Sequence, residues 1–588
     1  MKPAGRILLL ALVILATVLL SAGTWRVFGH TWDEPEHLAA GIELIDRGRY
    51  EYDTEHPPIG RILMAIGPYL AGARSWGTPP PDGVQEGIDI LYRSGHYDEY
   101  LTLARLGMMP FLLLLLISMW LWARQTAATD AEALLALIML ASVPPVLGHA
   151  ALATLDVAAA ATTLFALYWL QRWIVSGRWR DAALFGFTTG LAFGTKFSSI
   201  PFILLGLVVL AGARLVSGDL GGRGGLLLRS SLDRDGGALP QGAHDSRGRT
   251  PSSRGPAFTP PALLGGLALA IVVGFVPIVM AYGIHSADPK LVTRRFDWAI
   301  SYLFKGGGWA YDLATAVATH VWLPRAFKLF FEGVVALKAH NDAGHMSFLL
   351  GHVRSNGWWY FYLVALAVKT PLPLLVTGPM GLGLMTRDGW RERNLWRLAP
   401  LPLFAAMLIF ASAYSRINIG IRHVLVLYPF LALGAAYLLA RLWRALATVS
   451  NPRIANIGRA AIVVLVGWQI SLLWTAFPDY LPYFNETVSH PQQVLVDSDL
   501  DWGQDLRRLE SALAALKVRQ LSLAYLGTAD LAREPLPPLT RLQPGHPVKG
   551  WVAITALARE HGLGGYAWLD AYKPIERIGK TVDIYFIP

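Results

Sequence analysis

The sequence of 588 residues contains no cysteine, and only 16% of its residues are charged. The absence of cysteine excludes disulfide bonds, thiolate catalysis and cysteine-ligated zinc or iron–sulfur centres. Soluble proteins carry about a quarter charged residues, so the shortage of charge excludes an ordinary soluble enzyme. The charges that are present gather between long uncharged stretches, and 54% of the residues are hydrophobic. This distribution is typical of a protein that crosses a membrane several times.

About eleven stretches approach the length of about 20 apolar residues that a membrane-spanning helix needs. Lys2 and Arg6 precede the first stretch and no small-residue cleavage site follows it, so we expect a retained helix and not a signal peptide. The predicted fold class is therefore a polytopic α-helical membrane protein. The predicted spans are 7–22, 103–123, 131–149, 154–174, 182–197, 199–214, 261–283, 358–384, 398–413, 423–441 and 460–477.

The arginines predict the orientation of the chain, because connections rich in arginine stay in the cytoplasm. Every second connection contains arginine, namely 124–132, 171–181, 214–260, 387–397 and 441–459. The net charge of +10 reflects these connections, so we do not expect nucleic-acid binding. The N-terminus is then cytoplasmic, and the segments predicted to lie outside are 25–102, 284–357, 414–422 and everything after Phe477.

Two segments differ from the rest in composition. Residues 214–260 are rich in Gly, Ser, Arg and Asp without apolar periodicity, which predicts a disordered cytoplasmic linker; a basic lipid-binding segment is the alternative. After the membrane region, 1–477, we expect residues 478–588 to form a small α/β domain on the outer face. Its predicted elements are a helix over 506–516 and strands over 494–496, 520–525, 551–555 and 582–587.

The first outer loop carries acidic residues close to the membrane. Asp33 and Glu34 follow the first helix, and a run from His56 through Pro57-Pro58-Ile59-Gly60 to Arg61 comes later in the same loop. Burial at a membrane interface raises the pKa of a carboxylate and makes it a useful base. The residues alone favour a catalytic carboxylate and an ordinary solvated loop about equally.

The Asp33-Glu34 pair followed by His56-Pro-Pro-x-Gly-Arg61 resembles the first luminal loop of protein O-mannosyltransferases, which carry Asp-Glu and then His-Pro-Pro-Leu-Gly-Lys. The many helices, the large first outer loop and the outer C-terminal domain resemble the GT-C superfamily. That superfamily includes lipid A aminoarabinose transferases and other enzymes that use polyprenyl-phosphate sugars. The large luminal insert of the eukaryotic protein O-mannosyltransferases is replaced by a small α/β tail, which weakens the case for a protein acceptor.

The resemblance implies an inverting transfer of a sugar from a polyprenyl-phosphate donor to an acceptor hydroxyl. By analogy Asp33 is the general base, and Glu34 orients the site or pairs with a basic residue. His56 is predicted to contact the phosphate or the acceptor, and Arg61 to contact the donor phosphate. Because a lipid phosphate leaves readily, positioning and charge stabilisation supply most of the catalysis.

Two charged residues inside apolar stretches are further candidates. Asp156 begins the predicted helix 154–174, where either the helix dipole favours an acid or the carboxylate faces a polar cavity. GT-C members often place a second acid here, so Asp156 joins the predicted catalytic residues. Lys196 either extends to the membrane interface or, as in related enzymes with Thr-Lys in this helix, contacts the donor phosphate.

The short outer turn 414–422 carries arginines against the charge trend of the other connections. We predict that Arg416, Arg422 and His423 bind the donor phosphate, Arg422 foremost, because a guanidinium grips phosphate through two parallel hydrogen bonds. His345 and Trp358, from the outer loop before it, are predicted substrate contacts.

The sequence does not favour a particular metal site. The histidines of 284–357 are loosely spaced, and metal dependence stays open, with a divalent cation as the alternative to none. The acidic run 497–505 has Trp502 and Arg508 where a calcium loop needs glycine and glutamate, so we expect a helix cap there. Because the run lies in the segment predicted to be outside, acceptor recognition stays open as a second role.

Together these patterns predict a glycosyltransferase of the bacterial inner membrane, with a polyprenyl-phosphate sugar as donor, mannose by the nearest resemblance. The acceptor is a glycan, a lipid or a protein. A polymerase or ligase that uses a diphosphate-linked oligosaccharide is the alternative. A secondary transporter is less favoured, because internal repeats and broken midplane helices are not evident.

Overall fold

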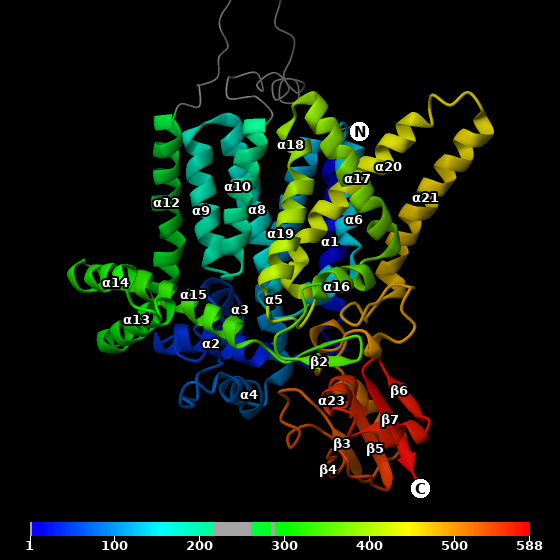
Figure 1. Ribbon diagram of the computed structural model, residues 1–588. Helices are drawn as coiled ribbons and strands as arrows, with labels where there is room; N and C mark the ends of the chain where they lie inside the picture. Colours follow the sequence, from blue (N-terminus) through cyan, green and yellow to red (C-terminus); the bar gives the residue numbers. More distant parts are fainter. Residues whose placement is uncertain (1–2, 217–259, 284–287, 322) are drawn as a thin grey trace, which may run out of the picture.

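The computed structural model describes residues 3–216, 260–283, 288–321 and 323–588. The predicted linker 214–260 lies almost wholly outside the described residues. The described chain forms a bundle of long helices, a group of helices that cross one end of the bundle, and a C-terminal mixed sheet at that same end (Figure 1). The predicted fold class, a polytopic helical membrane protein with a small C-terminal α/β unit, is confirmed.

Six described helices are long and apolar enough to cross a membrane, and the count rises to eight if each of two bent helix pairs is one span. The fourth of these helices includes the short segment α18, and the fifth includes η2. The helices are α1 (Pro3–Gly23), α5 (Tyr97–Thr126), α12 (Pro260–Gly283), α18 (Leu395–Leu398) with α19 (Pro400–Tyr414), η2 (Ile421–Leu427) with α20 (Tyr428–Ala445), and α21 (Pro452–Thr475).

Two predicted spans, 131–149 and 358–384, are each two helices and not one. The first is α6 (Asp130–Ala141) and α7 (Pro144–Ala150), bent by 65°, and the second is α16 (Phe361–Lys369) and α17 (Leu372–Glu392), bent by 119°. Proline explains both breaks, because it lacks the amide hydrogen and disfavours helical geometry in the residue before it. Pro144-Pro145 lies at the first break and Pro371 at the second.

The remaining three predicted spans are helices that are shorter or more polar than a typical membrane span. They are α8 (Asp156–Ser176), α9 (Trp179–Phe193) and α10 (Ser199–Val216). Helix α9 has only 15 residues, α10 counts among the shorter apolar helices, and α8 carries an acid in its first turn and Arg172 near its end. By length and composition the described chain therefore has six to eight spans, fewer than the eleven predicted.

Helix α20 is largely buried in the bundle and directly follows η2. The apolar window that contains it is 83% buried. It approaches α17 so closely that a β-carbon at Gly381 would stand 1.8 Å from the carbonyl oxygen of Gly434. Glycine at this contact lets the two backbones meet. The close contact with α17 holds α20, and with it the end of η2, in place.

The segments predicted to lie outside gather at the end of the bundle away from the N-terminus (Figure 1). Which side of the membrane this end faces stays a prediction. The first segment contains α2 (Glu34–Arg47), α3 (Pro58–Leu70) and α4 (Gly83–Arg93). The second contains α13 (Pro289–Leu303), α14 (Trp309–His320), α15 (Arg325–Ala343) and the antiparallel strands β1 (Ser347–Leu349) and β2 (His352–Arg354).

The C-terminal sheet has the strand order β4-β3-β5-β7-β6, with parallel pairs on one side and antiparallel pairs on the other. Helix α22 packs on one face through Leu506, Leu509 and Leu513, and α23 and η5 cover the other. The elements are α22 (Leu506–Ala515), β3 (Leu521–Ala524), β4 (Leu539–Arg541), β5 (Gly550–Thr555), α23 (Ala556–His561), η5 (Ala567–Ala571), β6 (Glu576–Ile578) and β7 (Val582–Ile587).

The predicted strand at 494–496 is wrong. These residues connect two short 3-10 turns, η3 (Pro491–Gln493) and η4 (Asp497–Asp499). The turn at Pro491 and the left-handed backbone of Asp497, at φ +54°, leave no room for an extended segment. Leu495 and Val496 are apolar because they pack into the core of the helical bundle. The domain boundary at 478 stays a prediction.

Candidate functional site

The neighbouring acids Asp33 and Glu34 have different environments. Asp33 directly precedes α2 and makes no capping hydrogen bond, and its side chain is 26% exposed. Glu34, the first residue of α2, is 1% exposed. Successive helical residues point about 100° apart, so the two carboxylates face different surroundings.

Glu34 is tied into the protein by hydrogen bonds from three segments. Arg105 of α5 donates to both of its carboxylate oxygens at 2.8 Å, and the backbone N–H groups of Thr31 and Ala153 donate at 2.7 and 2.8 Å. Burial acts to raise the pKa of Glu34, but the Arg105 guanidinium and these hydrogen bonds hold it below its ordinary value. Ionised Glu34 therefore links α2 to α5 and to the segment just before α8.

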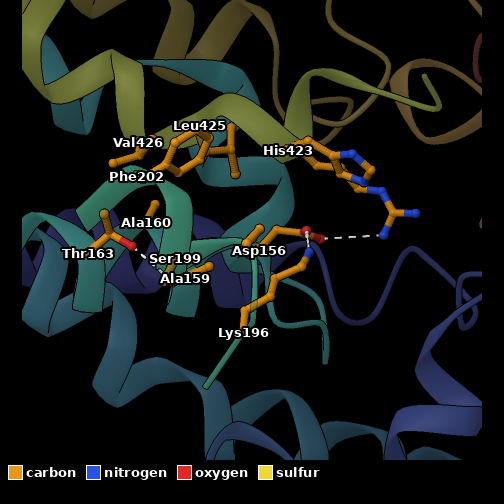
Figure 2. Close-up of a pocket in the computed structure, with 12 residues that line it drawn as sticks. Asp156, Ala159, Ala160, Thr163, Lys196, Ser199, Phe202, His423, Leu425 and Val426 are labelled. Atoms are coloured by element: carbon orange, nitrogen blue, oxygen red, sulfur yellow. Dashed lines mark hydrogen bonds and ion pairs between the residues drawn. The ribbon is translucent and has the colours of Figure 1, made fainter. Parts of the chain in front are cut away.

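Asp33 belongs to a chain of alternating charges. The Arg422 guanidinium lies 2.6 Å from an Asp33 oxygen and 3.6 Å from an Asp156 oxygen. On the other side of Asp156, the Lys196 ammonium lies 2.5 Å from its second oxygen, as Figure 2 shows. These four residues come from the start of α2, the start of η2, the start of α8 and the segment after α9. The structure thus brings together four of the residues singled out in the sequence.

Arg422 has hydrogen-bonding capacity to spare. It is buried, and its Nε–H has no hydrogen-bond partner among the described residues. A buried donor without a partner costs free energy, so such a group in a native protein marks a place where a further acceptor fits.

A small pocket opens beside this chain of charges, between α8, α10 and η2 (Figure 2). One part of its wall is charged or polar and contains Asp156, Lys196 and Arg422, together with His423. The rest of the wall is largely apolar and includes Ala159, Ala160, Phe202, Leu425 and Val426. Such a wall suits a ligand with a charged head and an apolar remainder.

A second polar cluster surrounds Arg61 in the first outer loop. Arg61 is 0% exposed and donates to His37 Nδ1, to Tyr50 Oη at 2.9 Å and to the Asp53 carboxylate and carbonyl. Burial and the Arg61 charge lower the pKa of His37, so that ring is a neutral acceptor. Arg61 does not line the pocket, and in the structure it joins parts of the first outer loop. Its contact with the donor phosphate stays a prediction.

The residues around Arg61 include a group that has the ligand types of a metal site. One ligand atom each from His37, Asp53 and His56 lie within 4.8 Å of one another, close enough to hold an ion. The Arg61 guanidinium already donates to two of the three residues and supplies the positive charge. A metal would have to displace that guanidinium, so these residues do not fit a resident cation.

Replacing Glu36 by glutamine is expected to stabilise the protein more at pH 8 than at pH 5. Burial, with Asp53 and other carboxylates nearby, raises the pKa of Glu36 from an ordinary 4.5 to about 8. Between these values the folded state binds the extra proton, so stability falls as pH rises. The melting temperature of Glu36→Gln relative to wild type should therefore increase across this range, by about 1 °C for each kcal/mol in a chain of 588 residues. The exposed Glu576→Gln of β6 is the control. A difference between Glu36→Gln and wild type that does not change with pH would contradict the expectation.

The other predicted site residues lie in three different settings. His56 is hydrogen-bonded to Asp53 at 2.9 Å. Trp358 is buried and its backbone N–H donates to Asn418, while Arg416 is exposed and donates to the Asp342 carbonyl. His345 lies near the charged chain, because Arg422 and Asp33 both act on its pKa, which burial lowers.

Sequence reasoning missed residues that lie against Arg422. The Trp502 ring lies 4.3 Å from the guanidinium, and the Asp497 carboxyl lies near Arg422 and Asp33, with burial raising its pKa to about 7. The one signal was the density of acids in 497–505, four of them in nine residues, which local rules explain equally well by a helix cap.

No protein-family model matches the chain, and no curated protein matches it in sequence. Solved structures match the chain over most of its length, at low sequence identity. Matches cover 99% of this chain and 98% of ArnT from Cupriavidus metallidurans bound to undecaprenyl phosphate, at 15% identity and a TM-score of 0.46. A second match covers 81% of this chain and 90% of the S. cerevisiae protein O-mannosyltransferase Pmt1–Pmt2 complex bound to the sugar donor. Its sequence identity is 11% and its TM-score is 0.49.

A third match is the Archaeoglobus fulgidus oligosaccharyltransferase, at 15% identity and a TM-score of 0.44. The match covers 88% of this chain and 58% of that protein, so the chain spans less than two thirds of its length. Because each TM-score lies below 0.5, the function proposed below rests on this chain's own side chains.

Proposed function

We propose that this chain is an inverting glycosyltransferase that moves a sugar from a polyprenyl-phosphate donor to an acceptor hydroxyl. The observation that carries the proposal is the contact between Asp33 and Arg422, 2.6 Å apart. It places a partly exposed carboxylate, able to accept a proton, beside a buried guanidinium able to bind phosphate. Sugar transfer from a lipid phosphate needs these two groups at neighbouring positions.

The reaction assigns one task to each group. The acceptor oxygen attacks the anomeric carbon, the bond from that carbon to the phosphate oxygen breaks, and the acceptor proton passes to Asp33. The departing lipid phosphate gains negative charge, which Arg422 and Lys196 stabilise. Such preorganised charges act strongly in a site from which water is largely excluded.

Donor binding and base activation are linked through Arg422. In the structure its guanidinium is shared between Asp33 and Asp156. A phosphate that takes over part of its hydrogen bonding leaves Asp33 a freer lone pair with which to accept the proton. Apolar side chains beside Asp156, among them Phe202 and Leu425, are proposed to contact the first part of the polyprenyl chain.

The finer assignments belong to the same proposal. The donor sugar is mannose by the motif resemblance, and the acceptor is a glycan, a lipid or a protein. We place the enzyme in the bacterial inner membrane with the site at its outer face, as the arginine distribution indicates. A donor with a diphosphate link is the alternative, and the donor assay below separates the two.

Arg422→Gln tests the proposal in proteoliposomes with a panel of labelled polyprenyl-phosphate sugars. The variant is expected to lower kcat/KM by about 10²–10³-fold, as loss of one strong electrostatic contact to a developing charge does. Arg519→Gln, an exposed arginine of the C-terminal sheet domain, is the matched control and should retain wild-type activity. Consumption of a diphosphate-linked donor alone would favour the alternative, and no consumption of either donor by folded wild type would overturn the proposal.

A further inference from the structure

The segment 498–504 joins the two loops that carry Asp33 and Arg422. The backbone N–H of Trp32 donates to the Trp502 carbonyl and that of Gly29 to the Gln504 carbonyl, both at 3.0 Å. On the other side, the Ser498 hydroxyl donates to the Ile419 carbonyl. One short stretch of chain thus holds both halves of the candidate site.

Trp502 supports the Arg422 side chain directly. Its ring is 2% exposed and lies 4.3 Å from the centre of the guanidinium, within range of a cation–π interaction. The ring meets His149 of α7 edge-on at 6.0 Å, which fixes its own position. The two carboxylates hold the guanidinium at its edge, and the face of this ring restricts its plane.

Asp499 fixes the backbone around Arg422. One of its carboxylate oxygens accepts from the Ile421 N–H at 3.0 Å, and Lys369, at the bend between α16 and α17, donates to its carbonyl oxygen. The segment around Ser498 packs closely against the loop before Arg422: a β-carbon at Gly420 would stand 2.1 Å from Ser498 Oγ. Glycine at 420 is what allows the segment and the Arg422 loop to meet.

From these contacts we infer that residues 498–504 are a positioning element of the active site, in which Trp502 orients the Arg422 guanidinium toward the donor phosphate. The inference rests on the proposed function and deepens it. Tryptophan has the strongest cation–π attraction of the aromatic residues, and it leaves the N–H groups at the edge of the guanidinium free for oxygen ligands. Trp502 touches Arg422 and not the reacting atoms, so its role is positioning.

The test compares Trp502→Leu, Trp502→Phe and Trp551→Leu, a partly buried tryptophan of β5, in the full chain. Trp502→Leu is expected to raise the donor KM about tenfold, in line with loss of a desolvated cation–π contact, with a smaller change in kcat and none in the acceptor KM. Trp502→Phe keeps an aromatic face and should restore most of the affinity. Trp551→Leu should leave all three constants at wild-type values.

Several outcomes would overturn the inference. They are a Trp502→Phe variant as impaired as Trp502→Leu, a change in the acceptor KM instead of the donor KM, or no difference between Trp502→Leu and Trp551→Leu. If Trp502→Leu does not fold, Ser498→Ala removes only the tie to the Arg422 loop and should raise the donor KM several-fold; an unchanged KM would then contradict us.

Binding of undecaprenyl phosphate to wild type and to each purified variant distinguishes a failure of the proposed function from a failure of the inference about Trp502. Wild-type protein that neither binds this lipid nor consumes a donor would overturn the proposed function and the inference together. Wild-type protein that binds and transfers normally, beside a Trp502→Leu variant that binds equally well, would overturn the inference alone.

Discussion

Replacing Asp33 by asparagine is expected to lower sugar transfer by about 10²–10⁴-fold while the protein stays folded. Asparagine has nearly the same size and still accepts a hydrogen bond from Arg422, so the 2.6 Å contact survives in weaker form. It does not accept a proton from the acceptor hydroxyl, however. The loss should therefore fall mainly on kcat, measured by transfer from a labelled polyprenyl-phosphate sugar.

Asp312→Asn is the matched control, because Asp312 lies on the exposed helix α14, whose residues are all outside the core. It should leave kcat and KM unchanged. Transfer that continues at the wild-type rate in Asp33→Asn would move the base to Asp156, the other carboxylate on Arg422. Glu34 is the weaker substitute, since both of its oxygens are already engaged by Arg105.

Replacing Glu34 by alanine is expected to destabilise the fold by about 3–5 kcal/mol, in contrast to its neighbour Asp33. Both Glu34 and Arg105 are 1% exposed, so the substitution leaves a guanidinium charge buried without its partner. The N–H groups of Thr31 and Ala153 lose their acceptor as well. Unfolding of the purified protein by a denaturing detergent measures the loss.

The exposed pair His96–Glu99 at the start of the same helix α5 provides the control. Glu99→Ala should change stability by less than about 0.5 kcal/mol, because water already solvates both partners. Arg105→Ala and the double variant complete the cycle, and the double variant should lose less than the sum of the two single losses. A loss in Glu34→Ala no greater than that in Glu99→Ala would show that the buried pair contributes nothing.

Several residues of the candidate site were visible in the sequence because charge is costly in apolar surroundings. Asp156 and Lys196 stand in stretches with few other charges, and Arg422 interrupts a turn where arginine is not expected. Each was named singly. That Arg422 lies between Asp33 and Asp156 follows from the packing of α8 and η2, which no local pattern encodes.

The different roles of Asp33 and Glu34 show where local patterns stop. In the sequence they are adjacent acids, and the Asp-Glu motif does not distinguish one from the other. The separation appears only because Arg105, 71 residues from Glu34 along the chain, lies on one side of α2, while Arg422, 389 residues from Asp33, reaches the other.

The sequence by itself determined the membrane-protein class, where the apolar helices lie, most of the C-terminal strands and the chemical types present at the site, but not the number of spans. These depend on hydropathy, periodicity and the cost of isolated charge, which are properties of short segments. Only the tertiary structure decided which charges pair, that two predicted spans bend at proline, and that Trp502 lies against Arg422. Those features are contacts between segments distant along the chain, and their geometry is set by how the helices and the C-terminal segment pack.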